Sequence, residues 1–243
     1  MTPAIADVVK ELTPTGKIRV SINLGNVVLA KQDPTTKELS GVSVDLAREL
    51  GRRLGAPIEL TPFPAAGRVF EAVKAGTLDL MFLAIEPVRA QEISFTPPYV
   101  LIEGTYLVLK DSPFKSVEEL DRPGHRIAVN TGSAYDLFLT RTLKQATILR
   151  GPDGIAMLLK DKLEAAAGVK QALVIHARTD ASVRVMAGRF QVIEQAMGTP
   201  AGRPAAARYL RGFIEEMKAS GFVAEALKRH NQPDATIAPP AAG

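Results

Sequence analysis

Glu86 and Arg89 are the two residues of this 243-residue chain with the clearest potential for ligand chemistry. They follow the apolar run LDLMFLAI (78–85), which predicts a buried strand. In open α/β sheets, ligands bind beyond the carboxyl ends of the strands. A guanidinium offers two parallel N–H donors that fit a planar carboxylate. Arg89 is therefore a candidate carboxylate-binding residue, and the alternative is a surface arginine that pairs with Glu86 or Glu92.

Two further strand ends carry polar or glycine residues that suit a ligand. Gly25 and Asn26 follow a strand predicted over 17–24, while Gly132 ends and Ser133 follows one predicted over 125–132. Backbone N–H groups at the start of a helix favour an anion. Ser133 also fits the N-cap of the next helix, and capping and ligand contact are compatible because they use neighbouring groups.

Strand-like and helical patterns alternate along the chain and predict two α/β units of similar size. The first unit is expected to contain strands 17–24, 57–63 and 78–85 and helices 43–55 and 67–76, with Ser43 as an N-cap and Gly55 ending its helix. After an extended segment, 97–110, the second has a capping box at Ser116 and Glu119, strands 125–132, 146–151, 163–168 and 183–188, and helices 133–144 and 153–162. Helices 205–221 and 222–230 belong to neither unit, and 231–243 is expected to be a frayed tail.

Composition excludes several classes of function. Thirty Lys and Arg residues against 26 Asp and Glu give a formal charge of +4, without a concentrated basic patch. Aromatic residues make up 5% of the chain and tryptophan is absent, so we expect no nucleic-acid partner. The chain has no cysteine, and its histidines are scattered, so we expect no metal site. No phosphate- or dinucleotide-binding motif is present, and no cofactor is expected.

Targeting signals are also not evident in the sequence. No apolar stretch reaches the ~18 residues of a membrane span. The first 17 residues lack a basic segment followed by an apolar one, as a secretory signal would have. Either the native protein lacks a signal peptide or the peptide was removed and an initiator methionine added.

Several segments, in this order, resemble the family-3 extracellular solute-binding proteins, the periplasmic receptors that feed ABC importers of polar amino acids. The resemblance extends from about Lys17 to about Arg229, and its most specific string is R-x-x-x-I-x-F-T-x-P-Y, residues 89–99. The matching segments are IRVSINL, GVSVDLARELGRRLG, FEAVKAGTLDLMF, VRAQEISFTPPY, HRIAVNTGSA and LLKDKLEAAAG.

The resemblance implies an α/β fold of the type II periplasmic-binding-protein kind, with two lobes joined by two hinge crossings. Each lobe would be a mostly parallel sheet flanked by helices. Lobe one would hold residues 1–103 plus 193–243, lobe two residues 104–192, and the ligand cleft would lie between them. The return of the chain would place the closing helices in lobe one. A periplasmic location, an ABC permease partner and a monomeric state are also implied, although a cytoplasmic location stays open.

The resemblance also implies the site residues. Arg89 matches the arginine that binds the α-carboxylate of the ligand, and it would face a solvated cleft when the lobes are open. Gly132 and Ser133 match a loop that helps to hold the same carboxylate, with Thr131 and Asn130 nearby. Asn23 and Asn26 fall where the family often has an acidic and an aromatic residue. Their side chains either form hydrogen bonds with a polar group of the ligand or stabilise a turn.

Several positions depart from the family pattern. Leu83 and Ala84 replace small polar residues, and Glu86 stands where a threonine is common. The aromatic residue that often covers the ligand is replaced near Ala66 and Gly67.

The most consequential departure concerns the amine of the ligand. Val169 occupies the position of the aspartate that meets the ammonium, with Lys170 beside it. Because a buried ammonium without a counter-charge is costly, the expected ligand is a carboxylate without an α-amine, and Glu86 orients Arg89. The alternative is that the ligand carries an amine or guanidine group, which binds to the carboxylate of Glu86, Glu103 or Glu194. Glu103 is otherwise an exposed hinge residue, beside Gly104.

Three functions follow from these observations. The leading one is a non-enzymatic receptor that captures a small carboxylate-bearing solute by lobe closure for an ABC importer. The second is a dehydratase of the prephenate or arogenate type, with Glu86 or Glu194 as general acid. The third is a cytoplasmic or receptor-coupled sensor on the same fold.

Overall fold

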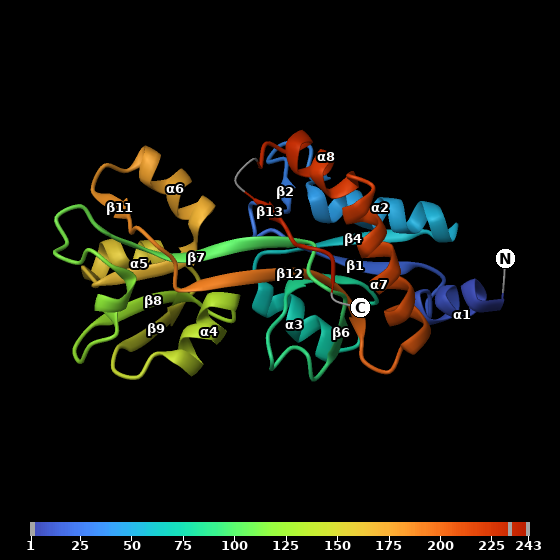
Figure 1. Ribbon diagram of the computed structural model, residues 1–243, viewed down its shortest axis with the longest axis horizontal. Coiled ribbons are helices and arrows are strands. Elements are labelled where there is room, and N and C mark those ends of the chain that lie inside the picture. Colours follow the sequence, from blue (N-terminus) through green and yellow to red (C-terminus); the bar gives the residue numbers. More distant parts are fainter. Residues whose placement is uncertain (1–2, 233–234, 242–243) are drawn as a thin grey trace. The chain divides into compact units, whose positions relative to one another are not determined.

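The computed structural model describes residues 3–232 and 235–241 of the chain. The chain forms two compact units, which are treated separately below. Unit 1 comprises Met1–Leu101 and Glu194–Gly243, and unit 2 comprises Ile102–Ile193. The chain leaves unit 1 within strand β7 (Val100–Leu109) and returns to it within strand β12 (Gln191–Pro200) (Figure 1).

Unit 1 is built around parallel strands that alternate with helices in the sequence. Strands β1 (Ile18–Asn23) and β4 (Ile58–Phe63) pair in parallel from Ile18↔Ile58 to Asn23↔Phe63. The N–H of Ser21 donates to the carbonyl of Leu80 at 3.0 Å, which places β5 (Met81–Ala84) on the other side of β1. Helices α2 (Val42–Leu54) and α3 (Ala66–Lys74) connect these strands. The carboxyl ends of β1 and β5 therefore lie at the same edge of the unit.

The returning part of the chain completes unit 1. Strand β12 pairs antiparallel with β5 and with β6 (Ile93–Phe95). Helix α7 (Pro204–Ala219) then packs against α1 (Pro3–Leu12), and α8 (Phe222–Arg229) packs against α2 (Figure 1). The Glu11 carboxylate accepts the N–H of Ala206 at 2.7 Å, so α1 caps the start of α7. A short hairpin, β2 (Lys31–Gln32) and β3 (Leu39–Ser40), precedes α2.

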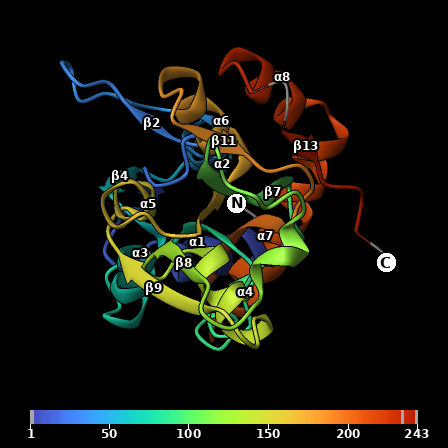
Figure 2. The same ribbon diagram turned by 90° about the vertical axis from the view of Figure 1, so that its left-hand side faces the viewer.

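Unit 2 is a mixed sheet with helices on both faces. Strands β8 (Arg126–Asn130), β9 (Thr147–Gly151) and β10 (Ala165–Val169) are parallel, and β7 joins β10 antiparallel. The side chains of Ile127 and Val129 pack on one face with those of α4 (Ala134–Thr142). On the other face, Ala128 and Ala166 pack with α5 (Gly154–Asp161) and α6 (Lys170–Thr179), and Figure 2 shows α4 and α6 on opposite sides of the strands.

The remaining short elements of unit 2 lie at its periphery. The 3₁₀ turn η1 (Val117–Leu120) carries the expected capping box of Ser116 and Glu119. Strand β11 (Val183–Val185) pairs antiparallel with β7.

Two expectations about unit 1 are wrong. Ser43 does not cap α2, which begins at Val42 after Gly41; the φ of Gly41 is 125°, and a Cβ there would collide with the carbonyl of Leu29. Ser43 is instead buried, with its Oγ 3.4 Å from the hydroxyl of Tyr99. The described part of the C-terminal segment is not frayed, because β13 (Thr236–Ile237) pairs with β7 and Ala238 is buried; residues 233, 234, 242 and 243 lie outside the described part.

Candidate functional site

The chain turns sharply after β5 and places Glu86 and Arg89 in one turn. The N–H groups of Arg89 and Ala90 both donate to the carbonyl of Glu86 at 3.0 Å. The N–H groups of Glu92 and Ile93 donate in the same way to the carbonyl of Arg89. Pro87 fits this turn because its fixed φ suits the position after the first residue. The local sequence therefore holds an acid and an arginine at the carboxyl end of a buried strand.

Arg89 is buried in the structure. Its exposed fraction is 1%, as is that of Glu86, and its Nη1 donates to the carbonyl of Ala84 at 3.0 Å. Burial lowers the pKa of the guanidinium to about 10, and the neighbouring Glu86 carboxylate opposes that shift. Arg89 therefore keeps its charge at neutral pH, and the alternative of a surface arginine is wrong.

Glu194 lies beside this turn along the sheet. Its carbonyl accepts the N–H of Ile85 at 2.9 Å, and the next residue, Gln195, is paired with Ala84. The Glu194 side chain is exposed. Unit 1 thus brings together Ala84, Glu86, Arg89 and Glu194.

Asn23 and Asn26 form turns at the same edge of unit 1. The Asn23 side-chain oxygen accepts the N–H of Gly25 at 3.1 Å, and that of Asn26 accepts the N–H of Val28 at 3.3 Å. Both are Asx-type bonds, in which the side chain stabilises its own loop. The turn interpretation therefore describes these two residues in the structure. A contact of either residue with a ligand remains a proposal.

In unit 2, the loop after β8 already binds a carboxylate of this chain. Gly132 has a φ of 72°, and its N–H donates to Oδ2 of Asp136 at 2.8 Å. Ser133 is the N-cap of α4, since its Oγ accepts the N–H of Asp136 at 3.0 Å. Asp136 also accepts from Nε of Arg150 at 2.9 Å. Thr131 is held by its N–H and its hydroxyl, which both donate to the carbonyl of Gly151.

A cluster of one acid and two cations lies at the end of β10. Val169 is the last residue of β10, and Lys170 begins α6. The Lys170 Nζ is 2.6 Å from Oε2 of Glu103, and Nη1 of Arg189 is 2.7 Å from Oε1 of the same carboxylate. Bonds from Lys170 and then from Arg189 lower the pKa of Glu103. Because two cations occupy Glu103, we no longer assign it to a ligand amine.

Sequence reasoning did not find all of these residues. Asp136 stands three residues after Ser133, a capping spacing that could have marked it. The sequence marks Lys170 only as the neighbour of Val169. Arg189 carried no local signal, because it meets Glu103 from 86 residues further along the chain.

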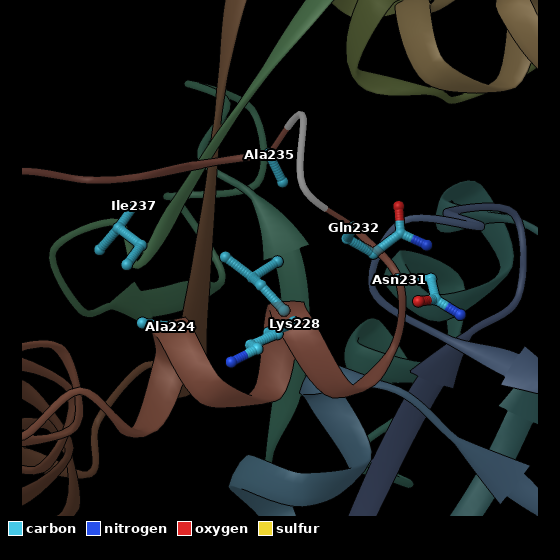
Figure 3. Close-up of a pocket in the computed structure, with 7 residues that line it drawn as sticks. Ala224, Lys228, Asn231, Gln232, Ala235 and Ile237 are labelled. Carbon is cyan, nitrogen blue, oxygen red and sulfur yellow. The ribbon is translucent and has the colours of Figure 1, made fainter.

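Other kinds of site are not indicated in the described residues. Within residues 3–232 and 235–241, no three His, Asp or Glu side chains are grouped to hold a metal ion. Among the helices of that same part, none is long and apolar enough to cross a membrane. A cavity of about 360 Å³ lies between α8 and the C-terminal segment, as Figure 3 shows. It contains none of the predicted ligand-binding residues; its lining is formed by Ala224, Leu227, Lys228, Asn231, Gln232, Ala235 and Ile237.

Comparison with known families decides the class of this protein. Residues 19–233 match the model of the bacterial extracellular solute-binding proteins, family 3. The chain belongs to this family. The match begins within β1 and extends beyond α8, and it therefore includes every residue predicted for the site.

Individual relatives are more distant. The chain is 30% identical over 122 residues to the cyclohexadienyl dehydratase of Pseudomonas aeruginosa, a match that spans 49% of this chain and 45% of the relative. The chain thus aligns with less than half the length of that enzyme.

Solved structures establish the fold, which is that of the type II periplasmic binding proteins. The L-cysteine receptor of Neisseria gonorrhoeae is similar, with a TM-score of 0.79, 22% identity and 94% of each chain covered. A mutant of ArgBP from T. maritima has a TM-score of 0.77 and 18% identity, and the similarity covers 92% of this chain and 99% of that one. The expected α/β architecture is therefore confirmed.

Proposed function

We propose that this family member captures a small carboxylate-bearing solute for an ABC importer, outside the cytoplasmic membrane and as a monomer. The observation that carries the proposal is the charged, buried guanidinium of Arg89 at the carboxyl end of β5. Away from water, a guanidinium attracts a carboxylate more strongly than it does in solution. Capture by lobe closure through hinge bending, which the family resemblance implies, is part of this proposal.

The loop of unit 2 supports the same chemistry. Its Gly132 N–H and the start of α4 already bind a carboxylate, that of Asp136. A ligand carboxylate would have to take over the Gly132 N–H from Asp136, which would remain paired with Arg150. We therefore retain Thr131, Gly132 and Ser133 as proposed ligand-binding residues, together with Asn23, Asn26, Ala84, Glu86, Arg89 and Glu194 of unit 1.

The charges at the end of β10 favour a ligand without an α-amine. Val169 offers no counter-charge, and the adjacent Lys170 would repel an ammonium. One similar structure is described as a receptor for L-cysteine, and the ArgBP of T. maritima is also described in an arginine-bound form, so an amino-acid-like carbon skeleton fits the family. We propose that the ligand is an organic acid of this size whose amine is absent or replaced.

A thermal-shift screen with matched pairs tests this function. Each α-amino acid is compared with the acid that lacks its amine, for example alanine with propionate and leucine with 4-methylpentanoate. A ligand at ~100 times its dissociation constant adds about 2.7 kcal/mol of stability, which produces a clear shift. Stabilisation by amine-free acids supports the proposal. A panel in which only α-amino acids stabilise the protein contradicts the amine-free assignment, and a panel without any carboxylate that stabilises it contradicts the function.

A dehydratase is the second candidate, and the relative from Pseudomonas aeruginosa favours it. Glu86 or Glu194 would serve as the general acid that protonates the departing hydroxyl. Incubation of the protein with prephenate, followed by measurement of the keto acid product, tests this activity. Product formed by the wild type and lost in Glu86→Gln or Glu194→Gln would establish the enzyme, whereas ligand binding without product supports the receptor.

A further inference from the structure

The Asp136 carboxylate divides its two oxygen atoms between different partners within unit 2. Its Oδ2 accepts the N–H of Gly132 at 2.8 Å, and its Oδ1 accepts from Nε of Arg150 at 2.9 Å. Asp136 is only 3% exposed, so the carboxylate is shielded from water. Because the two bonds use different oxygen atoms, the bond to Gly132 can break while the bond to Arg150 is kept.

The groups around this carboxylate are held in place by bonds of their own. The N–H of Asp136 donates to Oγ of Ser133 at 3.0 Å, and its carbonyl accepts the Thr140 hydroxyl at 2.7 Å. Arg150 lies in β9, and its Nη2 donates to Oγ1 of Thr140 at 2.6 Å. Helix α4 contacts both β8 and β9 (Figure 1). Loss of the Gly132 bond would therefore leave the start of α4 and the Arg150 side chain fixed.

A ligand carboxylate that approaches the Gly132 N–H would meet a group of the same charge. A backbone N–H has one hydrogen and can bond well with one carboxylate at a time. Two carboxylates that converge on one donor also repel each other, and they repel more strongly where water is excluded. Arg150 contacts Asp136 at Oδ1, on the oxygen that Gly132 does not use. The resident carboxylate therefore opposes the binding of a second one.

We infer that Asp136 is an internal competitor for the ligand carboxylate and that Arg150 positions it, so that the two residues set the affinity of the Gly132 loop. This inference rests on the proposed function, which assigns Gly132 to the ligand carboxylate. Asp136 holds the loop, with Gly132 at a φ of 72°, until the ligand takes over the N–H. The bond that Arg150 keeps with Oδ1 then stabilises the displaced side chain.

Calorimetric titration of the 243-residue chain with acetate, propionate and 4-methylpentanoate tests the inference. Asp136→Asn keeps an oxygen that can accept from Arg150 and removes the negative charge. We expect this variant to bind at least one of the acids about tenfold more tightly than the wild type does. The reason is that an amide neither repels the acid nor holds the Gly132 N–H as strongly as a carboxylate. A residue that only caps α4 would give unchanged or weaker binding.

The amide signal of Gly132 in heteronuclear NMR spectra locates the effect. This signal should shift during the titration of Asp136→Asn, because the acid binds at that N–H. A gain in affinity without a shift of the Gly132 signal would place the acid elsewhere and overturn the inference.

Asp153→Asn is the matched control, because it removes the same charge from the start of another helix of unit 2. Asp153 is exposed, caps α5 and accepts the N–H groups of Ile155 and Ala156 at 3.0 and 3.1 Å. Asparagine caps a helix about as well as aspartate does. This variant should bind the acids within about twofold of the wild type, since the charge of an exposed residue is screened. A gain as large as that of Asp136→Asn would overturn the inference, because net charge alone would explain it.

Arg150→Gln tests the positioning role in the opposite direction. Without the guanidinium, the displaced Asp136 carboxylate has lost its charged partner, so the affinity for the acids should fall about fivefold. In the double variant Asp136→Asn/Arg150→Gln this fall should disappear, because no carboxylate then needs a partner. A fall of equal size in the double variant would show that Arg150 attracts the ligand directly, and it would overturn the positioning role.

The outcomes separate the inference from the function on which it rests. If the wild type binds the acids and Asp136→Asn binds them equally or more weakly, the inference is wrong and the proposed function stands. Binding by Asp136→Asn alone supports the inference. If neither protein binds any of the acids, the proposed function fails for them and the inference fails with it. Thermal unfolding verifies that each variant is folded, and Asp136→Ser, which also removes the charge, takes the place of an Asp136→Asn variant that does not fold.

Discussion

Glu86 and Arg89 carry opposite charges, lie three residues apart in one turn, and are each only 1% exposed. Their backbones are joined by the bond from the Arg89 N–H to the Glu86 carbonyl at 3.0 Å. Removing one member of a buried charge pair typically costs more than removing both, because the remaining charge loses its compensation. The pair therefore contributes to folding as well as to the proposed binding.

A double-mutant cycle on stability tests this relationship. We expect Arg89→Met and Glu86→Gln each to lower the free energy of unfolding by about 3 kcal/mol. The double variant should lose about 1 to 3 kcal/mol less than the sum. Urea denaturation of the four proteins measures the coupling.

The exposed pair Arg68 and Glu71 provides the matched control for this cycle. Its side chains are 67% and 59% exposed at a distance of 2.8 Å. We expect it to show coupling of about 0.5 kcal/mol or less. Equal coupling in the two pairs would contradict the role assigned to burial.

Asp79 forms ion pairs with Arg19 and Arg203 in unit 1. Its replacement should lower the free energy of unfolding by an amount that depends on pH. Its carboxylate accepts from Arg19 Nε at 2.8 Å and from Arg203 Nη1 at 2.8 Å. Burial raises the pKa of Asp79, but the bonds from Arg19 and Arg203 outweigh it and bring the pKa below its usual value. The stabilisation is thus complete above the unfolded pKa of about 3.9 and is lost as the pH falls through the lower folded pKa.

The measurement is urea denaturation of the wild type and Asp79→Asn at several pH values. Near pH 7 we expect the variant to be less stable by about 3 kcal/mol. The difference should shrink steadily once the pH falls below about 4. Glu59→Gln, which breaks an exposed pair with Lys17, should change stability by less than about 1 kcal/mol at any pH. A difference for Asp79 that is independent of pH would show that the carboxylate charge is not the cause.

Ser133 should affect stability through capping and affinity through ligand contact, and two substitutions separate the effects. Ser133→Ala removes the acceptor of the Asp136 N–H and should cost about 1 kcal/mol of stability. Ser133→Asn keeps an N-cap acceptor and should restore that stability. If the hydroxyl also contacts the ligand carboxylate, Ser133→Asn should still bind about tenfold more weakly. If Ser133→Asn binds the ligand as tightly as the wild type does, Ser133 acts only as the N-cap of α4.

Elements with strong local patterns were predictable from the sequence. Leu46, Leu50 and Leu54 recur every four residues, and all three are buried on α2, which ends at the left-handed Gly55. Strand β5 itself, MFLA, is apolar and buried at every residue, as is typical of a strand covered on both faces. The turn after it was recognisable because Pro87 and two charged residues interrupt the run.

Elements whose placement depends on distant contacts were not predictable in this way. Helix α6 buries only Leu173 fully, so its apolar periodicity is weak. Helix α1 depends on α7, which it caps through Glu11, and β13 forms only by pairing with β7. The site residues show the same limit. The sequence indicates a carboxylate-binding role for Arg89 at the end of a strand, but the burial of Arg89 depends on the tertiary packing of unit 1. Likewise, the ion pair between Glu103 and Arg189 forms only when unit 2 is folded.

Val169→Asp should convert the end of β10 toward an amine site. An aspartate there would add a carboxylate beside Lys170, at the position that the family resemblance assigns to an ammonium-binding aspartate. We expect the affinity for α-amino acids to rise about tenfold relative to the matched amine-free acids, which corresponds to one charged hydrogen bond. Calorimetric titration with alanine and propionate, or with the best pair from the screen, measures the ratio.

Val169→Asn is the control, because it has the shape of aspartate without its charge. This variant should leave the ratio near the wild-type value, since an amide oxygen attracts an ammonium only weakly. If both variants gain affinity for α-amino acids equally, the new side chain contacts the ligand as a polar group, and its negative charge is not the cause. No gain in Val169→Asp would mean that the ammonium position does not lie at Val169, and the argument for an amine-free ligand would lose its basis.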